Sequence, residues 1–198
     1  MSAANRIIIA SKNHGKIREI QEILKGIPFE TAGMTAAGIN DEIDENGKSY
    51  SENALIKAMH IYTITGERVI SDDSGLEVDA LSGRPGIYSA RYAETSEKRI
   101  QRLLTELKGV PAEKRSARFV CVSCLLINRE TRYFFHGTVE GFITTEPRGN
   151  NGFGFDPVFF LPEYNMTMAE LSSEIKNSIS HRAKAFSELR NFLISGNY

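Results

Sequence analysis

Two adjacent aspartates, Asp72 and Asp73, follow an apolar run in the stretch ISDDSGLEVDAL. A charged side chain where a strand leaves the core costs desolvation free energy unless a cation or a hydrogen-bond donor pairs with it. Carboxylates at a strand end are a usual means of holding Mg²⁺, which prefers oxygen ligands. Because neighbouring strand residues face opposite sides, one aspartate can bind metal while the other braces a loop. The alternative is an Asx turn, which Asp-Ser-Gly also favours.

A second polar stretch, SKNHGK at residues 11–16, lies between an apolar run and a helical pattern. Ser11, Asn13 and the backbone N–H groups can donate to phosphate oxygens, and Lys16 adds a positive charge in the first helical turn. The stretch is not a Walker A loop, because that motif needs glycine where Ala10 stands. It indicates either a phosphate-binding loop or simply a capped helix start.

An acidic loop, DEIDENG at residues 41–47, offers further carboxylates, with Glu45 among them. It is either a second source of metal ligands or a solvated turn.

The glycine-rich loop GNNGFGFDP carries two rings, Phe153 and Phe155, either of which can stack on a purine. In the same loop Asp156 can accept from a base N–H. The alternative for this loop is a turn with buried phenylalanines.

A basic stretch, KNSISHRAKA, brings together the donors Lys176, His181 and Arg182. If these donors converge on the edge of a base, they favour bases that present carbonyl acceptors. The alternative is a basic, solvated helix start.

Periodicity predicts the elements that position these groups. Apolar and β-branched runs predict strands at residues 6–10, 28–32, 68–73, 117–128, 131–146 and 158–161. Apolar spacings of three and four predict helices at residues 15–26, 49–66, 96–109 and 173–194, the third capped by Ser96 and the last broken near residues 177–180. These elements indicate an α/β fold with a mixed sheet. We find no linker or repeat, so we expect a single domain over residues 1–198.

Composition excludes several classes of protein. The formal net charge is -1, which argues against nucleic acid held by bulk charge. Apolar runs are too short for a membrane span or for an N-terminal secretion signal, so we expect a cytoplasmic protein.

The pair Cys121 and Cys124 lies in a predicted strand, where residues three apart face opposite sides. We therefore expect two buried thiols and not a zinc or redox site.

Five blocks, in this order, resemble the inosine triphosphate pyrophosphatases, also called Ham1-like or non-canonical purine nucleoside triphosphate pyrophosphatases. The blocks are SKNHGKIREI, ENGKSYSENALIKA, SDDSGLEVDALSGRPGIYSARYA, NGFGFDPVFF and SHRAKA. The resemblance implies Mg²⁺-dependent cleavage of ITP, dITP or XTP to the monophosphate and pyrophosphate by a homodimer. It also implies an ITPase-like α/β fold, a long mixed sheet with two α/β lobes and an active-site cleft between them.

The resemblance also implies roles for individual residues. Asp73 takes the position of the general base and, with Glu45, of a metal ligand. Phe153 is the stacking candidate for the base. The implied substrate-binding residues are Ser11, Lys12, Asn13, His14, Gly15, Lys16, Ser74, Phe153, Gly154, Phe155, Asp156, Lys176, His181 and Arg182. The chain departs from the family pattern at Lys12, where glycine is common.

Two other functions remain open at this point. One is a Maf-like nucleotide pyrophosphatase with a different base preference. The other is a sensor that binds a nucleotide without cleaving it. The adjacent aspartates argue against a sensor, because binding alone does not need Asp73 beside a phosphate loop. Release of pyrophosphate in the presence of Mg²⁺ distinguishes an enzyme from a sensor.

Overall fold

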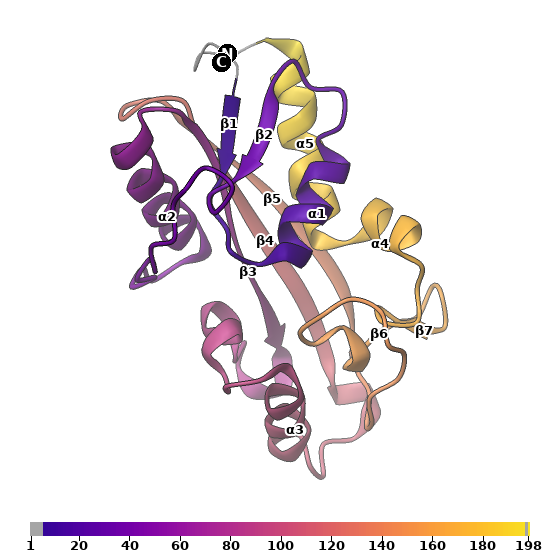
Figure 1. Ribbon diagram of the computed structural model, residues 1–198. Coiled ribbons are helices and arrows are strands. Elements are labelled where there is room, and N and C mark those ends of the chain that lie inside the picture. The colour runs from indigo at the N-terminus through magenta and orange to yellow at the C-terminus, as the bar shows by residue number, and fades with distance from the viewer. Residues whose placement is uncertain (1–5, 197) are drawn as a thin grey trace. The chain divides into compact units, whose positions relative to one another are not determined.

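The computed structural model describes residues 6–196 and 198 (Figure 1). Residues 1–5, which belong to the N-terminal stretch where we expect no secretion signal, lie outside the described residues. Seven strands form one sheet in the order β2-β1-β3-β4-β5-β6-β7. They are β1 (Arg6–Ile9), β2 (Glu30–Gly33), β3 (Arg68–Val78), β4 (Ser116–Leu126), β5 (Arg132–Ile143), β6 (Phe159–Leu161) and β7 (Met166–Thr167). Because β1 pairs in parallel with β2 and β3, and β6 pairs antiparallel with β5 and β7, the predicted mixed sheet is confirmed.

The helices match the predicted pattern. They are α1 (His14–Ile23), α2 (Tyr50–Thr65), α3 (Ser96–Glu106), α4 (Ser173–Ile179) and α5 (His181–Ser195). The break between α4 and α5 falls at Ser180, whose backbone is extended, as the sequence predicts. Within the described chain we find no helix with the length and apolar character that a bilayer crossing requires.

The predicted cap of α3 is wrong by one residue. Thr95, and not Ser96, has extended backbone angles, and its hydroxyl accepts from the N–H of Lys98 at 3.2 Å. Serine and threonine are both good capping residues, so residue type does not separate two neighbours. The conformation decides, because Ser96 is already helical.

The prediction that a strand ends at Asp73 is also wrong. Strand β3 continues through Ser74 to Val78, so the Asp-Ser-Gly stretch is not an Asx turn. Both aspartates are buried, and each has polar partners on its own face of the strand. Since these partners offset the desolvation of the carboxylates, the strand can continue past them.

Two compact units make up the described chain. The first contains the described residues up to Asp73, Cys121–Gly137 and the chain from Arg182 onward. The second contains Ser74–Val120 and Thr138–His181. Strands β3, β4 and β5 contribute residues to both units. A single domain over residues 1–198 stays a prediction.

The first unit has a core on each face of its strands. Ile7, Ile9 and Ile70 pack with apolar residues of α1 and α5, whereas Ile8 and Val69 pack with apolar residues of α2. This alternation follows from the two-residue period of strand side chains. Figure 1 shows α1 and α5 together on one face and α2 on the other. Two neighbouring residues of one strand therefore meet different helices.

The two cysteines are free and fully buried, one in each core of this unit. Burial raises the pKa of Cys121 and of Cys124 to about 12. The prediction of buried thiols is confirmed.

Ser123 on β4 provides a stability prediction. Its side chain is fully buried, and its hydroxyl has no hydrogen-bond partner among the described residues. An unsatisfied buried hydroxyl costs about 1–3 kcal/mol. We therefore expect Ser123→Ala to leave the free energy of unfolding unchanged or to raise it by about 1 kcal/mol. Urea denaturation measures this, and a loss above about 1 kcal/mol would show that the hydroxyl is satisfied in solution.

Candidate functional site

Asp72 lies at the centre of a buried ionic group on the α1 and α5 side of β3. Its Oδ2 is 3.0 Å from Lys16 Nζ and 3.6 Å from Arg182 Nη2. Arg182 also places Nη1 2.6 Å from Glu19 Oε2. Burial alone would raise the pKa of Asp72, but Lys16 and Arg182 outweigh it and hold that pKa well below its ordinary value. Asp72 is therefore a permanent anion that positions two cations.

Asp73 faces the other side of β3, towards α2. Its Oδ2 accepts from Asn53 Nδ2 at 2.9 Å, and its Oδ1 is 3.9 Å from Lys57 Nζ. The same ammonium is 2.9 Å from Glu45 Oε1. Burial raises the pKa of Asp73 above its ordinary value, against the opposing effects of Lys57 and Asn53. Asp73 is thus a better proton acceptor than an ordinary aspartate.

The predicted phosphate loop is folded around its own cap. Asn13 Oδ1 accepts from the N–H groups of Gly15 at 2.9 Å and Lys16 at 3.1 Å, and Ser11 Oγ accepts from the N–H of Asn13 at 3.1 Å. These bonds engage three of the backbone donors that a phosphate could use. The N–H of Ser11 donates to Ile9 O at 2.9 Å, so among the described residues the loop's backbone donors outside these bonds are those of Lys12 and His14. Contact of the side chains of Asn13 and Lys16 with phosphate stays a prediction.

In the second unit, three of the predicted base-binding residues lie together. Asp156 Oδ2 accepts from the N–H of Phe153 and from Lys176 Nζ, each at 2.8 Å. Lys176 Nζ also lies 4.6 Å from the centre of the Phe153 ring, in a cation–π contact. Asp156 and Lys176 are both buried, whereas Phe153 is half-buried. The group presents a carboxylate acceptor, an ammonium donor and an aromatic face side by side.

The other predicted residues have different surroundings. His181 is buried and stacks on Phe119 with ring centres 4.8 Å apart. Phe155 belongs to the core of the second unit and meets Tyr92 edge to face. Arg182, predicted at the base edge, makes its ion pairs with Asp72 and Glu19 in the first unit. Their roles towards a substrate stay predictions.

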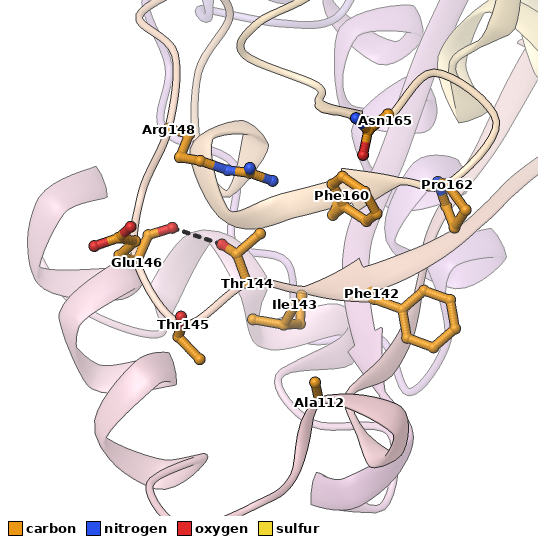
Figure 2. A pocket seen from close by; sticks show the side chains of 10 residues that line it. All are labelled: Ala112, Phe142, Ile143, Thr144, Thr145, Glu146, Arg148, Phe160, Pro162 and Asn165. Carbon is orange, nitrogen blue, oxygen red and sulfur yellow. Dashed lines mark hydrogen bonds between the residues drawn. The ribbon is translucent and has the colours of Figure 1, made fainter.

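Two cavities lie in the second unit. One, of about 630 Å³, is lined by residues of α3 and by Gly152, Phe153 and Gly154 of the glycine-rich loop. The other, of about 500 Å³, lies beside β5 and β6, where Arg148 covers the Phe160 ring (Figure 2). No predicted site residue lines the second cavity. Of these two cavities, the first offers room beside the predicted base-binding residue Phe153.

Gly152 provides a prediction about this group. Its φ is +76°, and a Cβ at this position would lie 2.1 Å from Asp156 Oδ2 and 3.1 Å from Lys176 Nζ. We expect Gly152→Ala to displace this carboxylate and to raise KM for the nucleotide about tenfold or more, with a smaller effect on kcat. Steady-state kinetics measure this. Gly154→Ala is the control, because φ there is +66° but nothing lies within 4 Å of the added Cβ. Equal effects of both changes would mean that backbone strain alone is responsible.

Sequence reasoning missed Asn53, Lys57 and Glu19. A signal for the first two was present: Asn53 and Lys57 are four residues apart on the same face of α2 as the buried residues Ala54 and Ala58. Polar residues that interrupt an apolar helical face need buried partners. Glu19 carried no such signal, since α1 has a polar face of its own.

Comparison with known proteins agrees with this arrangement. The model of the Ham1 family matches residues 7–192. A dITP/XTP pyrophosphatase of Bacillus licheniformis is 49% identical over 92% of this chain and 95% of that protein, and one of Bacillus subtilis is 44% identical over 94% and 96%. A HAM1 protein from Coxiella burnetii has a similar structure, with a TM-score of 0.89, 41% identity and coverage of 96% of this chain and 99% of that one. The chain belongs to the Ham1 family.

Proposed function

We propose that this protein is a nucleoside triphosphate pyrophosphatase that hydrolyses purine triphosphates with a 6-keto group, namely ITP, dITP and XTP, to the monophosphate and pyrophosphate. One observation carries the proposal: adjacent aspartates of one strand have opposite environments. Asp72 is locked between two cations, whereas Asp73 has a raised pKa beside Glu45 and Lys57. The activity in the names of the relatives supports the same reaction.

The residues around Asp73 fit a divalent cation, which we propose to be Mg²⁺. Asp73 and Glu45 offer hard carboxylate oxygens, and both lie near the single ammonium of Lys57, so a positive charge is already favoured between them. No cluster of three or more His, Cys, Asp or Glu side chains that could hold a metal occurs in the described part of the chain. Two carboxylates are the number that Mg²⁺ commonly takes from a protein, with substrate phosphate and water completing its shell. When bound, Mg²⁺ would polarise the attacking water and neutralise phosphate charge.

The chain's own residues then have separate tasks. Asp73 orients a water molecule and accepts its proton as the water oxygen attacks the α-phosphorus. The bond between the α-phosphorus and the bridging oxygen to the β-phosphorus breaks, and pyrophosphate leaves with the bonding electrons. Lys16, held by Asp72, neutralises charge on the phosphates. The raised pKa of Asp73 suits its task, since a carboxylate of higher pKa is a stronger base.

Base selection follows from the chemistry of Asp156 and Lys176. A 6-keto purine presents an acceptor at O6 and a donor at N1–H, which match an ammonium donor and a carboxylate acceptor. Adenine presents the reverse, a donor at the 6-amino group and an acceptor at N1. With Lys176 opposite position 6 and Asp156 opposite position 1, adenine would set donor against donor and acceptor against acceptor, and such mismatches exclude ligands strongly.

Three further properties belong to the proposal. We propose a homodimer, as the resemblance to the family implies. We propose a cytoplasmic location, which fits the work of removing damaged nucleotides from the pool. The substrate is the free nucleotide and not a nucleic acid, in keeping with the net charge of -1.

Product analysis tests this proposal against its rivals. The protein is incubated with XTP or dITP and Mg²⁺, and the products are separated by anion-exchange chromatography. We expect monophosphate and pyrophosphate in equal amounts. Diphosphate with inorganic phosphate would mean cleavage at the other anhydride bond. Nucleotide that binds but stays intact would favour the sensor. Cleavage only of nucleoside triphosphates with other bases would favour the Maf-like alternative.

A further inference from the structure

One face of α2 carries a row of three polar side chains. Asn53, Lys57 and His60 are spaced by four and three residues, so they lie above one another along the helix. The first two have contacts in the group around Asp73. His60 lies one turn further from Asp73 and has no role in the proposed reaction.

The acidic loop that precedes α2 runs back along this row. The N–H of Gly47 donates to Asn53 Oδ1 at 2.9 Å, and Glu45 Oε1 lies 2.9 Å from Lys57 Nζ. The approach at Gly47 is close, since a Cβ there would lie 2.7 Å from Asn53 Oδ1. Loop and helix are therefore in register over these two contacts.

A third contact continues the register. Asp41 Oδ2 lies 2.7 Å from His60 Nε2, so decreasing loop numbers meet increasing helix numbers. On either side of Asp41, Ile39 and Ile43 pack into the apolar cluster on the α2 side of the unit. Asp41 lies between these two apolar anchors, at the end of the loop away from Gly47.

The loop needs such an anchor because of its charge. Four of the five residues from Asp41 to Glu45 are carboxylates. Like charges at this density repel one another and favour solvent over a packed position. The Asp41 contact with His60 opposes this tendency at one end, and the Glu45 contact with Lys57 opposes it at the other.

We propose that Asp41 and His60 are a positioning pair, which holds the acidic loop along α2 and thereby keeps the Glu45 carboxylate in place for a divalent cation. The pair touches neither substrate nor the reacting atoms, and it acts only through the loop. This inference rests on the proposed function, because Glu45 is a metal ligand only if the site binds a metal. It goes beyond that function in naming what sets the cation affinity of the site.

The test compares His60→Ala with Thr63→Ala, a change at an exposed position of the same helix. Amide hydrogen exchange of residues 41–47 is followed without metal or nucleotide, and the Mg²⁺ concentration for half-maximal pyrophosphate release is measured. We expect faster exchange in His60→Ala and a half-saturating Mg²⁺ concentration about two- to fivefold higher, as for the loss of a partly exposed pair. The kcat at saturating Mg²⁺ should stay within about twofold of the wild type.

A conservative variant and a double variant make the test specific. His60→Gln places an amide donor near the position of Nε2, and it should restore most of the Mg²⁺ affinity. Asp41→Ala combined with His60→Ala should raise the half-saturating Mg²⁺ concentration no further than either change alone, because both changes remove the same contact. Exchange and Mg²⁺ dependence in His60→Ala that match those of Thr63→Ala would overturn the proposal.

The outcome for the pair is separable from the outcome for the proposed function. If the wild type releases no pyrophosphate from any purine triphosphate, the proposed function fails. Binding of Mn²⁺, followed by electron paramagnetic resonance, together with the exchange rates still decides the positioning role. Weaker Mn²⁺ binding and faster exchange in His60→Ala would support the pair, and unchanged values of both would overturn it.

Discussion

Asp73→Asn is expected to reduce kcat for XTP about 10²- to 10⁴-fold, the range typical for removal of a general base. The change keeps the shape of the side chain, so Asn53 and Lys57 keep their neighbours. The protein should stay folded, with a melting temperature equal to that of the wild type or higher. The reason is the raised pKa of Asp73: a carboxyl group whose pKa is higher in the folded than in the unfolded state lowers the stability once the pH is high enough to ionise it. Steady-state kinetics and thermal denaturation measure both effects.

The combination of lost activity and retained stability is the informative result. A kcat within about tenfold of the wild type would remove Asp73 from the mechanism. A large fall in melting temperature together with lost activity would make the effect structural. The substitution Glu45→Gln is a useful companion, because the Glu45 side chain is partly exposed and shares the Lys57 contact. It should weaken the response to Mg²⁺ more than it lowers kcat at saturating Mg²⁺.

Asp72→Asn, one residue away, is expected to act mainly on stability. Removing this carboxylate leaves Lys16 and Arg182 without their shared anion, and Arg182 is 2% exposed. Loss of one partner of a buried ion pair costs about 3–5 kcal/mol. We expect about 3 kcal/mol, since Glu19 still pairs with Arg182. The melting temperature should fall by about 6–12 °C for a chain of this length.

The pH dependence of this effect has a definite sign. The pKa of Asp72 is depressed in the folded state, so its contribution is present above the unfolded pKa and is lost as the pH falls. The stability difference between the wild type and Asp72→Asn should be constant above about pH 5 and should shrink below about pH 4. Asp73→Asn is the matched control, because it changes an adjacent aspartate to the same residue. Equal losses of stability in both variants would contradict the assigned environments.

Local patterns are sufficient to predict most of the fold. The β-branched run before Ala10 and the apolar spacing around Ile20 predict a strand and a helix that the structure contains. The predicted cap of α3 is misplaced because two capping residues stand side by side. The predicted strand at Asp73 ends too early because adjacent charges indicate an exit from the core. In both cases the deciding information is conformational or tertiary, and residue type does not carry it.

The site is predictable in part for a similar reason. Short blocks of sequence indicate Asp156, Phe153 and Lys176 as candidates, and these three do lie together. The partners of Asp72 and Asp73 come from distant parts of the chain, such as α2 and α5. Their contacts depend on which face of a strand each carboxylate occupies and which helix covers that face. A sequence pattern gives the alternation of faces but not the identity of the covering helix.

The most direct measurement is pyrophosphate release from XTP, dITP, ITP, GTP and ATP, each with Mg²⁺ and with EDTA. The proposed site predicts rapid release from the first three in Mg²⁺, little from ATP, and none in EDTA. Guanine shares the 6-keto group but carries an amino group at position 2. The rate of release from GTP therefore measures how strongly the site excludes that amino group. Equal release from ATP and XTP would contradict the assignment of base selection to Asp156 and Lys176. Unchanged release in EDTA would contradict the divalent-cation site at Asp73 and Glu45.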